Sequence, residues 1–535
     1  MKSRRLMVLL ALTMAVTLSA CQRVSPGEAE DTIGDVRQEM TSDAAQKDTM
    51  REEDEDSLVW RIASPGTSEE EMDVLIGNWQ GTLNNLLEQK GAGYSVRMEA
   101  FGCTDDAVEQ AVQTADELEE LFMSGEQTDV ISILPPMQYE DLKGYQLAYQ
   151  ECAERNLLMP LDSLLDTEKG KVLCDAIPAR DLERAKVHGV TYGLSAVLPA
   201  IQAVVYSQEQ MEQHGIDAKE LTGSIFTKED VLQKIRERTG EAPYGIRTGD
   251  VKRKLGLWIV DPSCNLALDG EGKFVNITET REFREYLTKL ADWKEKGLVE
   301  VIGSSKGAEM FFVQDMGEEN YSDQPYQATL GVTLRDGTEK TASVLVVPDE
   351  TSPVLSPYWG DNKLCIASWT QQQEKAEDFL IRLMTDPEIA NLIQYGREGD
   401  GYTLNGYILE IASGANVFQR FFGYQYTNPL ITYSTAVMAQ DKQAYAERFH
   451  EACEKAIPDG FRFDPAPVAE QIVRTNQVFG DMGGSETAGK IANLEIEDVD
   501  QVIAEITGEL KEAGMDEVVA EANRQLEEWK KEAGK

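Results

Sequence analysis

Cysteine and histidine are the side chains that most often ligate metals or act as nucleophiles and bases, and this sequence uses both sparingly. Its 535 residues include seven cysteines and three histidines. Six of the cysteines lie far apart without any C-x-x-C pair, which argues against a zinc site: Cys103, Cys152, Cys174, Cys264, Cys365 and Cys453. The histidines are equally scattered, so a metal cluster or a catalytic triad is poorly supplied: His188, His214 and His450. We therefore expect no metal, no cofactor and no enzymatic activity, while the pairing of the six cysteines stays open.

Cys21 is the cysteine with a recognisable chemistry, because it follows Leu-Ser-Ala at the end of a short apolar segment. Three basic residues open the chain, and the apolar run over 6–16 is too short to cross a bilayer as a helix. The pattern resembles a bacterial lipoprotein signal. It predicts a signal peptide over 1–20, cleavage before Cys21, and acylation of its thiol with fatty acids such as palmitate. The mature protein would then be anchored by lipid to the extracytoplasmic face of the cell membrane. An ordinary secretory signal with a chance cysteine is the alternative.

The segment that follows Cys21 predicts a disordered acidic tether over 21–57. It is rich in Glu, Asp, Gln, Ser and Thr and has too few large apolar residues to fold alone. Acidity extends to the whole chain, whose formal net charge is −44. Such a charge argues against nucleic acid as a partner and against a peripheral grip on anionic lipids. With 41% hydrophobic residues, the rest of the chain can form ordinary globular cores.

The first part of the folded chain alternates between predicted strands and helices joined by short turns. These segments are a strand at 58–63, a helix at 69–89, a strand at 94–101, a helix at 107–123 and a strand at 129–134. This order predicts parallel strands covered by helices. Ligands of such sheets lie beyond the carboxyl ends of the strands. Here those ends are 64–66, 101–102 and 135–136.

The later segments indicate a second α/β unit and then a return of the chain to the first. The second unit fills roughly 200–320 and includes a hairpin at 266–277 and an amphipathic helix at 281–296. We expect 311–330 to cross between domains, and we assign the strand at 343–348 to the first domain. The expected domains are lobe 1 over 58–155 plus roughly 335–405, lobe 2 over 156–334, and a mainly helical C-terminal region over 406–535 that packs on the lobes. Several crossing segments would act as a hinge.

Motifs along nearly the whole mature chain resemble the family 1 extracellular solute-binding proteins, which are the lipoprotein receptors of bacterial ABC importers. The matching segments are 123–130, 159–165, G-x-x-Y-G at 189–193, 374–380, 385–388, 395–399 with Tyr402, 460–468 and 510–529. The chain departs from the family pattern at 195–198, which intervene before Pro199. The resemblance implies an α/β fold of the periplasmic-binding-protein kind, type II in style. It also implies a monomer that captures a solute between two lobes and delivers it to an ABC permease in the membrane.

Members of this family mostly deliver sugars, so the resemblance directs attention to aromatic residues near predicted strand ends and crossings. The apolar face of a sugar packs on an aromatic ring, while its hydroxyls need fixed amide and carboxylate partners. The candidate ligand-binding residues are Tyr139, Trp258, Tyr358, Trp359, Asp361, Asn362 and Tyr402, with Asp261 and Asn428 as further polar neighbours. For Trp258 and Tyr402, a structural role in the protein core is an alternative to ligand contact. Trp79 and Trp293 fall on apolar helix faces, where we expect core residues.

Two other classes of function remain alternatives. A secreted glycosidase would need a carboxylate pair, which so acidic a chain supplies by chance. The sequence has no nucleophile elbow, metal motif or glycine-rich phosphate loop. A peptide-binding or sensory lipoprotein is the other alternative, and a peptide rather than a sugar would then stabilise the protein.

Overall fold

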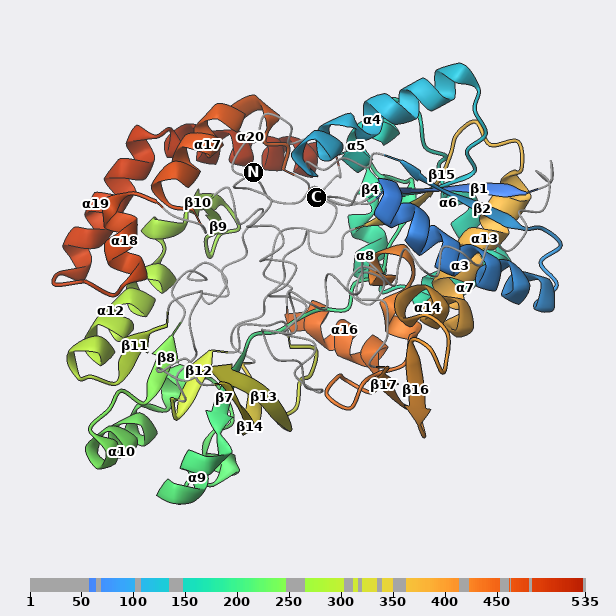
Figure 1. Ribbon diagram of the computed structural model, residues 1–535. Coiled ribbons are helices and arrows are strands. Elements are labelled where there is room, and N and C mark those ends of the chain that lie inside the picture. The colour runs from blue at the N-terminus through green and yellow to red at the C-terminus, as the bar shows by residue number, and fades with distance from the viewer. Residues whose placement is uncertain are drawn as a thin grey trace.

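The computed structural model describes residues 57–63, 69–101, 107–133, 148–246, 265–302, 311–315, 320–333, 339–349, 362–412, 423–452, 461, 463–480 and 484–532. These residues form two bodies, each built on one large sheet, and Figure 1 shows the two side by side. We call the body around the five-stranded sheet the first lobe and the body around the six-stranded sheet the second lobe. The two-lobed α/β fold expected from the sequence is confirmed.

The first sheet carries strands from three distant parts of the chain. Its order is β2 (Val96–Phe101), β1 (Leu58–Ala63), β3 (Val130–Ile133), β15 (Lys363–Ile366) and β6 (Gly193–Leu194). β1 pairs in parallel with β2 and β3, whereas β15 runs antiparallel to both β3 and β6. β1, β2, β3 and β6 therefore end at one edge of the sheet, and β15 begins at that edge.

Helices of the first lobe include the two expected from the alternation and several from later in the chain. They are α3 (Glu69–Gln89), α4 (Ala107–Ser124), α5 (Ala148–Glu154), α6 (Asp162–Leu165), α7 (Glu168–Ala176), α8 (Ala179–Arg184), α13 (Gln373–Thr385), α14 (Pro387–Tyr395) and α16 (Lys442–Ala452). Two hairpins belong to the same lobe: β4 (Lys186–Val187) with β5 (Val190–Thr191), and β16 (Tyr402–Asn405) with β17 (Ile408–Ile411).

Trp60 and Trp79 lie at the centre of the first core. The Trp60 indole is fully buried, donates from Nε1 to Ser132 Oγ at 2.8 Å, and meets the Phe379 ring edge-on at 5.4 Å. Trp79 is 1% exposed and packs edge-on against Tyr426 at 5.5 Å. The expectation that Trp79 is a core residue is confirmed. These contacts join β1, β3, α3 and α13 into one unit.

The second sheet is mixed. Its order is β11 (Val299–Val301), β8 (Tyr244–Ile246), β12 (Val313–Asp315), β7 (Ala203–Ser207), β14 (Glu339–Pro348) and β13 (Tyr326–Thr333). β8 is parallel to β11 and β12, whereas β7 is antiparallel to β12 and β14. β8, β11, β12 and β14 thus end at one edge, where β7 begins.

The C-terminal helices share the core of the second lobe. The lobe contains α9 (Gln208–His214), α10 (Glu229–Thr239), the hairpin β9 (Leu266–Leu268) and β10 (Phe274–Asn276), α12 (Arg281–Glu295), α17 (Ala469–Val478), α18 (Glu486–Ala492), α19 (Val499–Glu512) and α20 (Met515–Glu532). Leu510, Val518 and Leu526 are buried with the residues of α12 in one apolar cluster. In Figure 1 these helices, coloured red, lie beside α12, β9 and β10.

The helix α12 shows how sequence specifies structure in this lobe. The Thr280 hydroxyl accepts a hydrogen bond from the Phe283 amide at 3.2 Å and so begins the helix. Gly297, with φ of +68°, follows its end, where a left-handed conformation is required. Trp293 is fully buried, stacks on Phe226 at 5.6 Å and donates to the Glu229 carboxylate at 3.0 Å. The prediction of a core role for Trp293 is confirmed.

Several expected boundaries differ from the sheets and cores of the structure. β14 pairs with β7 and β13, so this strand belongs to the second lobe rather than the first. Residues 157–196 contribute buried apolar side chains to the first core rather than the second. The 311–330 segment contains β12 and most of β13 and does not cross between lobes. The apolar sequence of β14 predicts a buried strand in either sheet, and the sheet to which the strand belongs is known only from its pairing with β7 and β13.

Judged from the described helices and strands, the chain passes from one lobe to the other at three places. β6 leads to β7 through 195–202, β14 leads to β15 through 349–362, and α16 leads to Phe461 in the second core through 453–460. No helix among the described residues is long and apolar enough to span a membrane.

Replacing Trp60 with alanine tests the first core. We expect the free energy of unfolding to fall by about 3–5 kcal/mol, because the large buried ring leaves a cavity and Ser132 loses its partner. Denaturant melts give the value. Tyr407→Ala is the control, since Tyr407 is 88% exposed and its removal should cost within about 0.5 kcal/mol. Equal losses for the two variants would contradict the packing described.

Candidate functional site

The carboxyl-terminal edges of the two sheets are the edges that the crossing segments connect. The segment 195–202 leaves the first sheet at the end of β6 and reaches the second sheet where β7 begins. The segment 349–362 leaves at the end of β14 and reaches the start of β15. Ligands of open α/β sheets bind outside the carboxyl ends of strands. We therefore place the candidate site at these two edges, which the segment 195–202 joins.

Two buried charged residues hold the first-lobe end of the 195–202 segment. Lys363 is 1% exposed and donates from Nζ to Ser195 Oγ at 2.9 Å. The Asp181 carboxylate is 2% exposed and accepts the backbone N–H of Val197 at 3.0 Å. Burial raises the pKa of Asp181 to about 6, although the nearby Arg184 guanidinium opposes the shift. Burying these charges is costly, so their geometry around the segment is tightly specified.

Backbone hydrogen bonds hold the second-lobe end of the same segment. The Ile201 amide donates to the Asn320 carbonyl at 2.8 Å, and the Asp349 amide donates to the Gln202 carbonyl at 2.7 Å. The Asp349 carboxylate accepts from the Ser224 hydroxyl at 3.2 Å. The segment 195–202 is thus fixed to a different lobe at each end. Along this segment, relative motion of the lobes must be absorbed between Val197 and Ile201.

Most of the candidate ligand-binding residues lie outside the described residues. They are Tyr139, Trp258, Tyr358, Trp359 and Asp361, together with Asp261. The described chain stops near them at the ends of strands: β3 ends at Ile133, β8 ends at Ile246 and β15 begins at Lys363. Their assignment as ligand contacts stays a prediction.

Three polar or aromatic candidates are described, and two of them have structural roles. Asn428 is fully buried, donates to the carbonyls of Ala176 and Met384, both at 3.0 Å, and caps the turn that follows it. Tyr402 is 7% exposed and packs against the rings of Tyr395 and Tyr433 at about 6 Å. Burial raises its pKa to about 12.

Asn362 is the described candidate at the expected edge. It is 3% exposed and directly precedes β15, opposite the carboxyl end of β3. As a ligand contact it too stays a prediction.

Sequence reasoning missed Asp181 and Lys363. Lys363 had a signal, since it directly precedes the apolar run Leu-Cys-Ile, and in the structure it is the first residue of the fully buried strand β15. Asp181 had none, because its helix reads as an ordinary charged surface helix.

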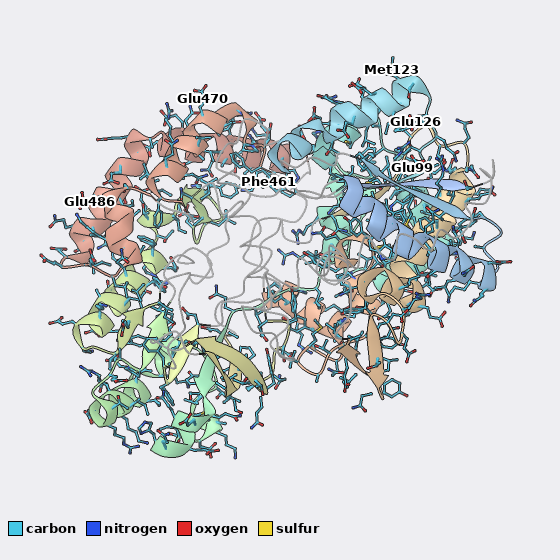
Figure 2. The ribbon with its side chains drawn as sticks, viewed as in Figure 1. Glu99, Met123, Glu126, Phe461, Glu470 and Glu486 are labelled. Atoms are coloured by element: carbon cyan, nitrogen blue, oxygen red, sulfur yellow. The ribbon has the colours of Figure 1, made fainter. Side chains whose placement is uncertain are left out.

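The acidic character of the chain is displayed on its outer surface. Figure 2 shows Glu470 and Glu486 on the outward side of the C-terminal helices, and Met123 and Glu126 at the outer end of α4. Within the described ranges, no group of three or more His, Cys, Asp or Glu side chains could hold a metal ion.

The comparisons with known proteins agree with this architecture. The chain is 22% identical over 491 residues to a carbohydrate ABC transporter substrate-binding protein of Streptococcus pneumoniae serotype 4, which covers 89% of this chain and 92% of that protein. Its structure is similar to the crystal structure of the N-glycan transport solute-binding protein NgtS of Streptococcus pneumoniae. The TM-score is 0.55 at 20% identity, over 89% of this chain and 99% of that one.

Two further matches complete the comparison. An extracellular solute-binding protein from Bifidobacterium longum subsp. infantis aligns with a TM-score of 0.48 at 13% identity, over 90% of this chain and 99% of that one. Residues 458–531 match DUF3502, a domain of unknown function. In the structure this match corresponds to the C-terminal helices of the second lobe.

The fold is that of the solute-binding proteins. The resemblance to the solute-binding receptors of ABC importers, expected from the motifs along the sequence, is confirmed by these relatives.

Replacing Asp181 with asparagine tests the buried carboxylate. In the native state this carboxyl takes up its proton near pH 6, whereas in the unfolded chain it does so near its ordinary value of about 4. Between these values the folded state binds more protons, so the stability that this group contributes at low pH is lost as pH rises to about 6. The unfolding free energy of the native protein relative to Asp181→Asn should therefore fall by on the order of 2 kcal/mol between pH 4 and 7.

The control is Val172→Ala, which changes an exposed side chain of α7 that does not titrate. Its difference from the native protein should not depend on pH over this range. A flat difference for Asp181→Asn would contradict the burial of that carboxyl.

Proposed function

We propose that this protein captures an oligosaccharide between its two lobes and delivers it to the permease of an ABC importer. The observation that carries the proposal is the arrangement of two α/β lobes whose carboxyl-terminal edges are joined by the crossing segments. The curated relative, which is a carbohydrate ABC transporter substrate-binding protein, supports the sugar class. The protein acts as a monomer without cofactor or metal.

Binding is coupled to lobe closure through contacts that one lobe alone cannot supply. A ligand shifts an equilibrium between two conformations only by its difference in affinity for them. A sugar that touches both carboxyl-terminal edges makes its full set of contacts only when the lobes approach. We propose that the aromatic candidates Trp258 and Trp359, which follow β8 and precede β15 in the chain, supply stacking surfaces.

The proposed role is binding without chemical turnover. The relatives are named as binding proteins. The buried carboxylates of the described site have structural partners: Asp181 holds the Val197 amide, and Asp349 accepts from Ser224. Glycoside hydrolysis requires two carboxyl groups that face each other across the bound sugar. Asp181 and Asp349 each bind a structural partner instead.

We further propose that the N-terminal segment attaches the protein to the membrane. We place the lipid anchor on Cys21, outside the described residues, and the tether over 21–57 joins the anchor to β1. A flexible chain of that length has an r.m.s. span of at least about 33 Å, because like charges extend it. The lobes would then stay close to the permease and remain free to reorient.

A thermal-shift screen over mono- and oligosaccharides tests the function. We expect a member of the panel to stabilise the mature protein, by about 2.7 kcal/mol when its concentration is one hundred times its Kd. Trp359→Ala should weaken that sugar's affinity by about tenfold or more, because stacking area is lost. Trp369→Ala is the matched control, since the Trp369 ring packs on the exposed Phe122 at the outer end of α4.

Two results would contradict the proposal. Stabilisation by peptides and by no sugar would favour a peptide-binding or sensory lipoprotein. Release of reducing ends from the stabilising sugar would favour a glycosidase.

Replacing Cys21 with serine tests the anchor. The native protein expressed in its bacterial host should incorporate labelled palmitate and sediment with membranes, whereas Cys21→Ser should do neither, because the acylated thiol is gone. Cys174→Ser, which removes an exposed thiol of α7, should behave like the native protein. Equal labelling of all three would exclude acylation at Cys21.

A further inference from the structure

Direct polar contacts between the lobes occur at two places in the part of the chain that the structure describes. At the first, the Ala439 amide donates to the Tyr321 carbonyl at 2.9 Å, and Arg448 forms an ion pair with Asp323. At the second, His188 of the β4–β5 turn lies 3.9 Å from Glu532 at the end of α20. Both partners of this second contact are more than 60% exposed.

The first contact is continuous with a crossing segment. The Ile201 amide of the 195–202 segment bonds the Asn320 carbonyl, and the next residue, Tyr321, bonds Ala439 of the first lobe. Asn320 is 1% exposed and donates from its amide to the Ser322 carbonyl at 2.6 Å, which fixes this turn. The turn at 320–322 is therefore hydrogen-bonded to the crossing segment on one side and to the first lobe on the other.

The helix α16 carries Arg448 as a rigid part of the first lobe. Lys442 in its first turn is 2% exposed, and its ammonium lies within 2.8–3.1 Å of the oxygens of Pro429, Thr432 and Tyr433. Ala446, one turn further on, is buried in the first core. Arg448 thus moves with the first lobe, and Asp323, located before β13, moves with the second.

We infer that the turn 320–323 and the segment from Ala439 to Arg448 form the hinge of the two lobes, and that the Arg448–Asp323 ion pair sets the balance between their arrangements. The inference deepens the proposed solute capture and rests on it. A rotation about the 195–202 segment displaces groups next to that segment least, so the backbone contact of Ala439 with Tyr321 persists, whereas the Arg448 and Asp323 side chains, which belong to different lobes, separate in one of the two arrangements. Because Arg448 is 58% and Asp323 27% exposed, the ion pair adjusts the equilibrium modestly rather than locking it.

The test measures lobe separation without ligand. Spin labels at residues 172 and 285, in α7 and α12, report the distribution of distances between the lobes in the chain with its other reactive thiols replaced by serine. Arg448→Glu and Asp323→Arg should each change the ratio of populations by about two- to fivefold, as expected for loss of a surface ion pair. The double variant, with the charges exchanged, should return the distribution to that of the parent.

The control is Arg524→Glu, which breaks ion pairs within α20 and should leave the distances unchanged. Asp323→Asn provides a milder variant if a reversal prevents folding. Identical distributions in parent and single variants, or a double variant that is no closer to the parent than the singles, would overturn the inference. Since no sugar is present, a failure here is distinct from a failure of the thermal-shift screen, which tests the solute-binding function itself.

Discussion

The anchoring of one short segment, 195–202, to a different lobe at each end is the constraint on which the rest of this structure depends. Lys363 and Asp181 hold its beginning through Ser195 and Val197, and the carbonyl of Asn320 holds its end through Ile201. Because both ends of the segment are held, the segment has one defined position relative to each lobe. The two sheets consequently keep their carboxyl-terminal edges next to the same crossing path, which is where a shared ligand can be held.

The energy of burying a charge explains how Lys363 and Asp181 can specify the position of the segment. A buried ammonium or carboxylate is stable only with well-placed partners, so an arrangement that misplaces the segment leaves a charge unsatisfied. Lys363, buried above the Tyr149 ring and bonded to Ser195, is an example. The surface contacts between the lobes are of the opposite kind. The ion pairs Arg448–Asp323 and His188–Glu532 join partly or largely exposed side chains, so each contributes little to stability.

The sequence predicted the local structure well where periodicity and capping are strong. The alternation over 58–134, the amphipathic helix of α12 and the buried positions of Trp79 and Trp293 follow from spacing alone. It failed at β14, because a run of valines specifies a buried strand but not the sheet in which that strand pairs. Asp181 was missed for a related reason, since the Val197 amide that it binds lies 16 residues away in sequence. The aromatic candidates between strands were chosen from the chemistry of sugars, and their contacts stay predictions.

The central claim is that the lobes close around a solute without changing it, and small-angle X-ray scattering during a titration with the stabilising oligosaccharide tests it most directly. The account predicts a fall in the radius of gyration that saturates at one sugar per protein, with the sugar recovered intact. A radius of gyration that stays constant while the sugar binds, or a sugar recovered as fragments, would contradict it.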